Sequence, residues 1–134
     1  MSILTPVVDP DAPAGDLGKK MGIEVLEASP ERSVARMPVE GNTQPYGILH
    51  GGAHLVLAES LGSMSAHLHA GPGRYAVGIE VNASHSRSVT SGWVTGTCTA
   101  ISLGRTITVH EVVMTDDAGR RLSTVRITNL LRDV

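Results

Sequence analysis

The sequence predicts an α+β domain in which one long helix packs against a single antiparallel sheet. Three observations support this prediction: a nearly uncharged run at residues 51–69, two extended segments before it, and four consecutive segments of strand character after it. Because a helix that is apolar on nearly every face must be covered on nearly every face, we expect the sheet to curve around it. A second subunit would then cover the remaining surface.

The elements before the long helix are short. Residues 1–14 are rich in proline and aspartate and are expected to form a flexible lead-in. A short helix is expected at residues 16–21, because Gly22 provides a stop signal directly after it. Two extended segments follow, at residues 23–28 and 33–38, separated by a Ser-Pro-Glu turn.

Glycine and proline bound the long helix and the strands that follow it. The run at residues 51–69 comes after a loop at residues 41–49 and ends at a Gly-Pro-Gly sequence, which is a strong helix stop. Beyond Tyr75 the pattern alternates with period two, which is typical of a strand with one buried face. That face carries Val77, Ile79, Val81 and Ala83. Further strands are expected at residues 92–101, 106–114 and 122–130.

Composition and charge exclude several classes of protein. With 134 residues, 41% of them hydrophobic and 18% charged, the chain has the balance of one globular domain, which we assign to residues 15–134. A net charge of −2 without a basic stripe argues against a nucleic-acid partner. The longest weakly polar run contains Glu59 and two histidines, so we expect no membrane span. Because the N-terminus has no signal-peptide pattern and Cys98 is the only cysteine, we expect a cytoplasmic protein.

Glu59 is the most informative residue, because it is the one charged residue in the run from Gly52 to Leu68. A helix of this kind is expected to bury it, and a buried carboxylate without a partner costs several kcal/mol. We therefore look for the chemistry at Glu59. The alternative is a structural one, in which Glu59 forms an ion pair with an arginine of a partner chain.

The start of the same helix offers a second chemical group. Free backbone N–H groups near Gly51 can stabilise negative charge that develops on an oxygen. Glu59 lies eight residues further on, about 12 Å along the helix axis. One reaction therefore uses both groups only if they come from different subunits, which predicts a site shared across a dimer interface. Ser63 lies one turn after Glu59, where it can bond the carboxylate or the substrate.

The histidines have more than one interpretation. His50 and His54 have the helical spacing of a metal-binding pair, but no acid follows His50 directly, and we expect no metal. We expect His54 to lie in the core or in an interface. His85 ends the strand alternation in phase with its apolar face and precedes Arg87. It is either a surface residue at a strand end or, with Arg87, part of a site for an acyl group and a phosphate.

Two stretches carry a family resemblance. The sequence QPYGILHGG at residues 44–52, followed by LAESLGS at residues 57–63, resembles the hotdog-fold acyl-CoA thioesterases. Within these it is similar to the phenylacetate-degradation type and the Arthrobacter-type 4-hydroxybenzoyl-CoA thioesterases. The nearest likeness is to the dihydroxynaphthoyl-CoA thioesterase of the menaquinone pathway and to its enterobactin-pathway proofreading relative. The later segments at residues 77–88 and 103–105 fit as well, so that the resemblance extends from about residue 16 to the end of the chain.

The resemblance implies a fold, an assembly and a set of catalytic residues. The fold is a long helix wrapped by an antiparallel sheet, and the assembly is a homodimer with two shared sites, usually paired into a homotetramer. Glu59 matches the nucleophile or general base that attacks the thioester or activates water. The Gly51 N–H of the other subunit matches the group that polarises the thioester carbonyl. Ser63 would assist Glu59 or the water.

The remaining matched positions belong to substrate binding. Gln44 and His50 would lie near the carbonyl or the leaving thiolate, with Gly52 beside them. His85 would border the acyl pocket, and Arg87 and Ser88 match the stretch near which such enzymes hold the CoA nucleotide. The implied substrate is an acyl-CoA or an aryl-carrier-protein conjugate, and no cofactor is needed because CoA is part of the substrate.

Several alternatives stay open at this stage. An aromatic acyl group follows from the resemblance only, and a general role in releasing trapped CoA is equally compatible. A different class of function is a non-catalytic acyl-CoA or acyl-carrier sensor that uses the same groove. A hotdog hydratase is a third, although such enzymes usually pair Asp and His within one short helix turn, and no such pair follows Gly52.

Overall fold

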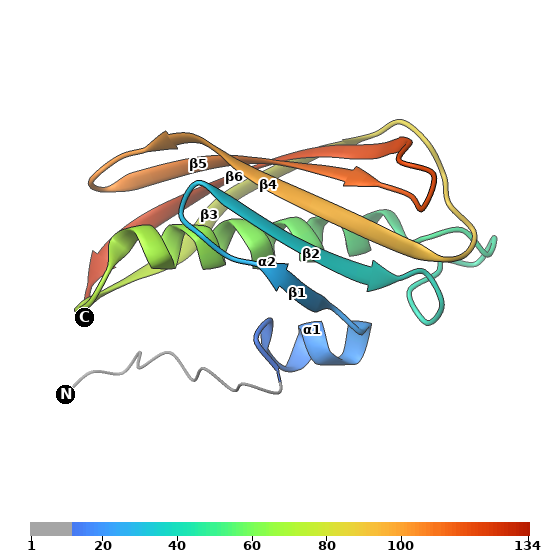
Figure 1. Cartoon of the computed structure of the whole chain (residues 1–134), viewed down its shortest axis with the longest axis horizontal. Helices are drawn as coiled ribbons and strands as arrows, with labels where there is room; N and C mark the ends of the chain where they lie inside the picture. Colours follow the sequence, from blue (N-terminus) through green and yellow to red (C-terminus); the bar gives the residue numbers. More distant parts are fainter. Residues whose placement is uncertain (1–11) are drawn as a thin grey trace.

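The computed structural model describes residues 12–134, and it confirms one long helix packed on a six-stranded antiparallel sheet (Figure 1). Most of the lead-in expected at residues 1–14 lies outside the described residues. The helices are α1 (Gly15–Met21) and α2 (Gly51–Ala70). The strands are β1 (Glu24–Glu27), β2 (Arg32–Pro38), β3 (Arg74–His85), β4 (Trp93–Leu103), β5 (Ile107–Thr115) and β6 (Arg121–Asp133).

The predicted elements are confirmed in kind and order, with small shifts at their ends. The sheet order is β1-β2-β4-β5-β6-β3, and every neighbouring pair is antiparallel. The strand β3 thus crosses from the end of α2 to the far edge of the sheet, next to β6. The stop signals act as expected: α1 ends at Gly22, whose φ of 76° lies in the left-handed region that favours glycine.

The helix α2 buries one face against the sheet. That face consists of small and aliphatic residues together with His54 and Ser65: Ala53, His54, Leu57, Ala58, Leu61, Gly62, Ser65 and Ala66. The helix lies close to the sheet at Gly62, where an added Cβ would overlap the Ile127 Cγ2 methyl group of β6. Glycine at this position therefore sets how near the helix lies to the sheet.

We expect Gly62→Ala to lower the free energy of unfolding by about 1–3 kcal/mol, because an extra methyl group in a close-packed core forces its neighbours to move. Urea titration followed by circular dichroism measures this loss. Ser60→Ala, on the half-buried side of the same helix, is the matched control and is expected to change stability by no more than about 0.5 kcal/mol. Equal stability of Gly62→Ala and the wild type would contradict the close packing.

One part of the predicted strand alternation is wrong. A β-bulge between Gly78 and Glu80 leaves Ile79 without a partner on β6. Gly78, Val81 and His85 pair with Asn129, Ile127 and Ser123, whose side chains are buried, so the inward face of β3 includes these three residues. Val77 pairs with Leu130 and faces outward. The extra residue shifts the period by one, which a simple alternation does not anticipate.

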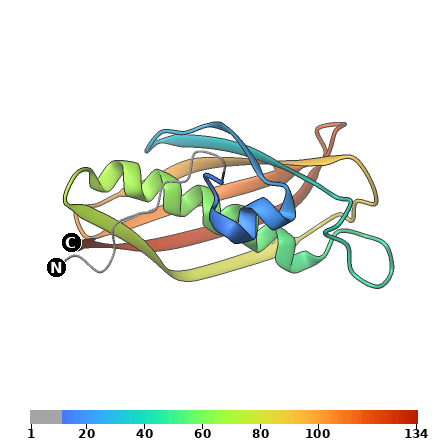
Figure 2. The same ribbon diagram turned by 90° about the horizontal axis from the view of Figure 1, so that it is seen from below.

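Glu59 is exposed within the single chain, which corrects the expectation that the helix buries it. The side of α2 that carries Glu59 also leaves the aliphatic residues Leu55 and Val56 only half-buried. The neighbouring edge strand β3 is exposed as well, and Figure 2 shows it along one margin of the molecule beside α2. The sheet of a single chain therefore covers only part of α2.

Candidate active site

The loop before α2 is held firmly at the helix start. The Leu49 N–H donates to the Val89 carbonyl oxygen at 2.9 Å, and the His50 N–H donates to the Asn42 carbonyl oxygen at the same distance. Val89 lies in the connection between β3 and β4, whose first part is in turn bonded to Leu122 at the start of β6. The first turn of α2 is thereby fixed relative to the sheet.

The first turn of α2 leaves one backbone donor free. His50 is the N-cap residue, and its Nδ1 atom accepts from the Gly52 N–H at 2.9 Å. The Ala53 N–H donates to the His50 carbonyl oxygen at 2.9 Å. Among the described residues, nothing accepts a hydrogen bond from the Gly51 N–H. The sequence-predicted group thus points out of the positive end of the helix and is available to an anion or a carbonyl.

His85 lies directly beside this donor. A Cβ added at Gly51 would lie 2.9 Å from His85 Nε2. The other ring nitrogen, Nδ1, is 2.9 Å from Ser123 Oγ, and Ser123 donates its own hydrogen to the Ser84 carbonyl oxygen at 3.2 Å. His85 Nδ1 therefore carries a ring hydrogen, and Nε2 faces the helix start. The sequence alone does not indicate Ser123, because it lies 38 residues from His85.

His54 is a core histidine, as expected, and it lies against His85. Its side chain is 3% exposed, and the two ring centroids are 5.1 Å apart. Burial, and secondly the proximity of His85, lowers the pKa of His54 to about 4. The buried ring is therefore neutral at physiological pH.

This shift makes stability depend on pH. Below about pH 6.5 the unfolded chain takes up a proton at His54, whereas the folded chain does so only near pH 4, so the stability present at pH 7 is lost as the pH falls between these values. We expect the free energy of unfolding of His54→Leu to rise relative to that of the wild type as the pH is lowered from 7 to 4.5. Urea titrations at several pH values measure the difference, and a pH-independent difference would contradict it.

The carboxylate of Glu59 lies over Gly78 of β3. A Cβ added at Gly78 would lie 2.7 Å from Glu59 Oε1, so only glycine admits the carboxylate in this position without a shift. Sequence reasoning did not single out Gly78. A glycine in the middle of an alternating strand is a signal of close approach that can identify such a position.

Ser63 lies one turn beyond Glu59 and turns its hydroxyl group toward the sheet. The hydroxyl donates to Asn129 Oδ1 of β6 at 3.1 Å. Ser63 was expected to bond either the Glu59 carboxylate or the substrate. Its hydrogen goes to Asn129 and not to the Glu59 carboxylate. Asn129 is directly opposite Gly78 in the pairing of β6 with β3, so Glu59 and Ser63 stand above two neighbouring residues of the sheet.

Gln44 belongs to the loop before the helix and is half-buried. Its side-chain Oε1 atom accepts from the Tyr46 N–H, and its backbone bonds to Gly47 and Ile48 close the turn. The oxygen of the side chain is thus used locally, whereas the amide nitrogen keeps its two hydrogens for another acceptor.

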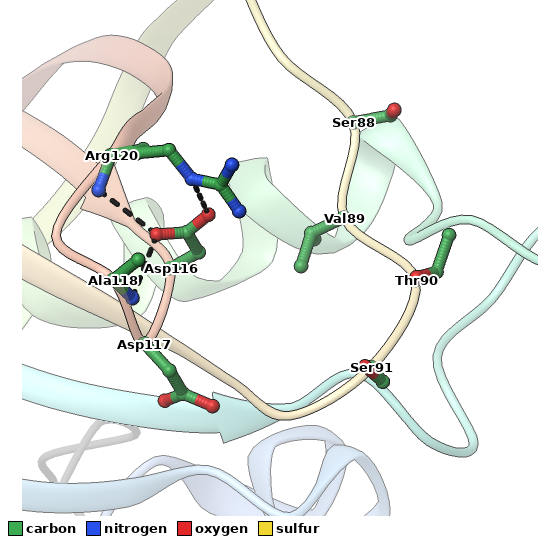
Figure 3. Close-up of a pocket in the computed structure, with 8 residues that line it drawn as sticks. All are labelled: Ser88, Val89, Thr90, Ser91, Asp116, Asp117, Ala118 and Arg120. Carbon is green, nitrogen blue, oxygen red and sulfur yellow. Dashed lines mark hydrogen bonds and ion pairs between the residues drawn. The ribbon is translucent and has the colours of Figure 1, made fainter.

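Arg87 and Ser88 are exposed in the connection between β3 and β4. Ser88 also lines an open hollow of about 280 Å3 between this connection and the turn from β5 to β6 (Figure 3). The hollow contains one guanidinium group, that of Arg120, which bonds Asp116 at 2.8 Å, and a second carboxylate, that of Asp117. Two acids against one base make the hollow a poor anion site by itself.

The single chain does not bring all of the predicted residues together. His50, Gly51, Gly52 and His85 gather at the start of α2, whereas Glu59 and Ser63 lie about 12 Å or more along the axis. Within residues 12–134, no group of three or more His, Cys, Asp or Glu side chains is arranged to hold a metal ion. The helices of this region also include none that is long and apolar enough to cross a membrane.

Comparison with known proteins assigns the family. Residues 46–123, from the loop before α2 to the start of β6, match the model of the thioesterase superfamily. The chain belongs to the thioesterase superfamily. The proofreading thioesterase EntH of Cronobacter turicensis is 44% identical to this thioesterase over 114 residues, which are 84% of the chain and 83% of the relative.

Solved structures confirm the fold of this thioesterase. A crystal structure of a mutant of thioesterase PA1618 from Pseudomonas aeruginosa has a TM-score of 0.88 at 38% identity and covers 98% of each chain. Thioesterase HI1161 from Haemophilus influenzae has a TM-score of 0.87 at 31% identity, over 97% of this chain and 92% of that one. The expected hotdog fold and thioester hydrolase class are thereby confirmed.

Proposed function

We propose that this thioesterase hydrolyses an acyl-CoA to a carboxylic acid and CoA, at sites shared between two subunits. The observation that carries the proposal is a pair of groups that complement each other chemically: the Gly51 N–H, which donates to nothing among the described residues, and the exposed Glu59 carboxylate. The N–H group can donate a hydrogen bond to a carbonyl oxygen, and the carboxylate can accept a proton from water or attack the carbonyl carbon. Because the two groups lie too far apart on one helix to act on the same thioester, they must come from two chains.

The exposed edge of the sheet supports a particular dimer. The β3 edge is long and apolar for a surface strand, with Val77 39% and Ile79 53% exposed. Such an edge favours pairing with another strand. Antiparallel pairing of two β3 strands centred on Asn82, with the bulge at Ile79 skipped as it is against β6, would set Gly78 of one chain opposite His85 of the other. Glu59 would then approach Gly51 of the partner subunit.

The chemistry follows from these two groups. Glu59 takes a proton from water, whose oxygen bonds to the thioester carbon, or its carboxylate attacks that carbon directly. The carbonyl oxygen becomes negative and is stabilised by the Gly51 N–H of the partner subunit and the positive end of its helix. The carbon–sulfur bond then breaks, and CoA leaves as a thiolate that needs little acid catalysis. After direct attack by Glu59, water hydrolyses the resulting anhydride, which releases the carboxylic acid and restores the carboxylate.

The other predicted residues have supporting roles in this proposal. The Gln44 amide group and His50 would lie near the carbonyl or the sulfur, and Gly52 would keep the first turn open for the substrate. Ser63 would assist the water, and His85 would border the acyl group. Arg87 and Ser88 would contact the CoA phosphates. An aromatic acyl group and a tetramer of two dimers are proposed from the family resemblance, as is a cytoplasmic location.

A panel of thioesters with a thiol-detecting dye tests the proposal. Aromatic and aliphatic acyl-CoAs and aryl-carrier-protein conjugates are each incubated with the wild-type protein. We expect release of free thiol, fastest with an aromatic acyl-CoA. Binding of acyl-CoA without thiol release would overturn the proposal in favour of a sensor, and faster release from the carrier-protein conjugates would assign the substrate to that class.

A further inference from the structure

The buried amide side chain of Asn129 contacts Ser63 of the proposed site. The fold by itself does not require an amide at this position. Its side chain is completely buried between α2 and the sheet. One of its polar atoms, Oδ1, accepts from Ser63, while among the described residues nothing pairs with the other, Nδ2. A buried polar group without a partner costs free energy, and an apolar side chain would avoid this cost.

The surroundings of Asn129 provide no other reason for an amide. Thr108 of β5 is its direct neighbour across the sheet, and the Thr108 hydroxyl is also buried, with no partner in the described part of the chain. On the other side Asn129 faces Gly78, which has no side chain. Within residues 12–134, the Asn129 side chain therefore makes one hydrogen bond, to Ser63, and this bond is what an amide adds at this position.

We propose that Asn129 is a positioning residue that fixes the hydroxyl group of Ser63 as an acceptor for the attacking water; this rests on the function proposed above. Because the Ser63 hydrogen is directed to Asn129, the lone pairs of Ser63 Oγ are free for a donor. Glu59, one turn earlier on the same side of α2, is also an acceptor.

A water molecule between these two acceptors would be fully oriented. One of its hydrogens goes to the Glu59 carboxylate and the other to Ser63 Oγ, so that its lone pair faces the thioester carbon. When the new carbon–oxygen bond forms, Glu59 receives the first proton and the carbon–sulfur bond breaks to release CoA thiolate. Without Asn129, the Ser63 hydroxyl can turn its hydrogen to Glu59, and the water loses its second acceptor.

A double-mutant cycle tests whether Asn129 acts through Ser63. We expect Asn129→Leu and Ser63→Ala each to lower kcat by about tenfold to a hundredfold. This is the rate loss that a small misplacement of a reactant causes, up to about a hundredfold. KM is expected to change less than kcat. Adding Asn129→Leu to Ser63→Ala is expected to cost less than about a further twofold, because the two residues share one interaction. Additive losses would overturn the proposal.

Two variants and one further measurement separate positioning from a structural effect. Thr108→Val removes the neighbouring buried hydroxyl and is the matched control, expected to keep kcat. Asn129→Val also removes the amide but carries a smaller side chain, and it replaces Asn129→Leu if the leucine variant does not fold. Hydroxylamine, a strong nucleophile that does not need an oriented water, should cleave the thioester nearly as fast with Asn129→Leu as with the wild type. An equal loss with hydroxylamine and with water would overturn the proposal.

The failure of this inference can be told apart from the failure of the proposed function. If the wild-type protein releases thiol and Glu59→Gln does not, the function stands whatever Asn129 does. If kcat of Asn129→Leu then equals that of the wild type while Ser63→Ala is impaired, only the positioning role is wrong. Absence of thiol release from the wild type with every thioester would remove both.

Discussion

Glu59→Gln is expected to lower kcat by about 10²–10⁴-fold, the range that a positioned acid–base group contributes. Glutamine has nearly the same size and keeps one oxygen, but it cannot accept a proton from water or attack a thioester. Because Glu59 is exposed in the chain and its side chain makes no hydrogen bond to the other described residues, stability is expected to change little. Thiol release under saturating acyl-CoA measures kcat, and a binding titration checks that the substrate still binds.

Two comparisons make this result specific. Glu111→Gln, on the outer face of β5 opposite Arg126, is the matched control and should leave kcat unchanged. The alternative role of Glu59, an ion pair with an arginine of a partner chain, predicts a different outcome: weaker dimers with normal turnover per dimer. Sedimentation of the Glu59→Gln variant distinguishes the two, and near-normal turnover would refute a catalytic role.

Gly51→Pro is expected to lower kcat by about 10²–10³-fold relative to Gly51→Ala, the cost of removing one donor to the developing oxyanion. Proline is well tolerated at the first position of a helix, and Gly51 is that position in α2. His50 before it already has an extended conformation, with φ of −63° and ψ of 129°, which suits a residue before proline. The substitution therefore removes the N–H group while the helix keeps its hydrogen bonds.

The alanine variant is an essential control, because any side chain at Gly51 meets His85 Nε2. The difference between proline and alanine isolates the N–H group. Mixing Gly51→Pro chains with Glu59→Gln chains adds a test of the shared site, since half of the sites in such a hybrid dimer would combine the intact Gly51 of one chain with the intact Glu59 of the other. Hybrids with no more activity than either parent would contradict sharing.

The sequence predicted most of the secondary structure because its signals are local. The Gly-Pro-Gly stop, the glycine after α1 and the alternating apolar residues each act within a few positions of the chain, and the observed elements follow them. The bulge at Ile79 is where this reasoning failed. An unpaired residue in β3 depends on the fit to β6, which lies about fifty residues later, and no local pattern records it.

For the site, the sequence by itself determined which chemical groups are present: one carboxylate in an otherwise uncharged helix, a glycine-rich helix start behind a histidine, and a serine one turn after the acid. The tertiary structure decided what surrounds them. It set Gly78 under the Glu59 carboxylate, Ser123 behind His85 and Asn129 behind Ser63. These contacts join residues far apart in the chain through sheet register and helix-to-sheet distance, which are properties of packing and not of local sequence.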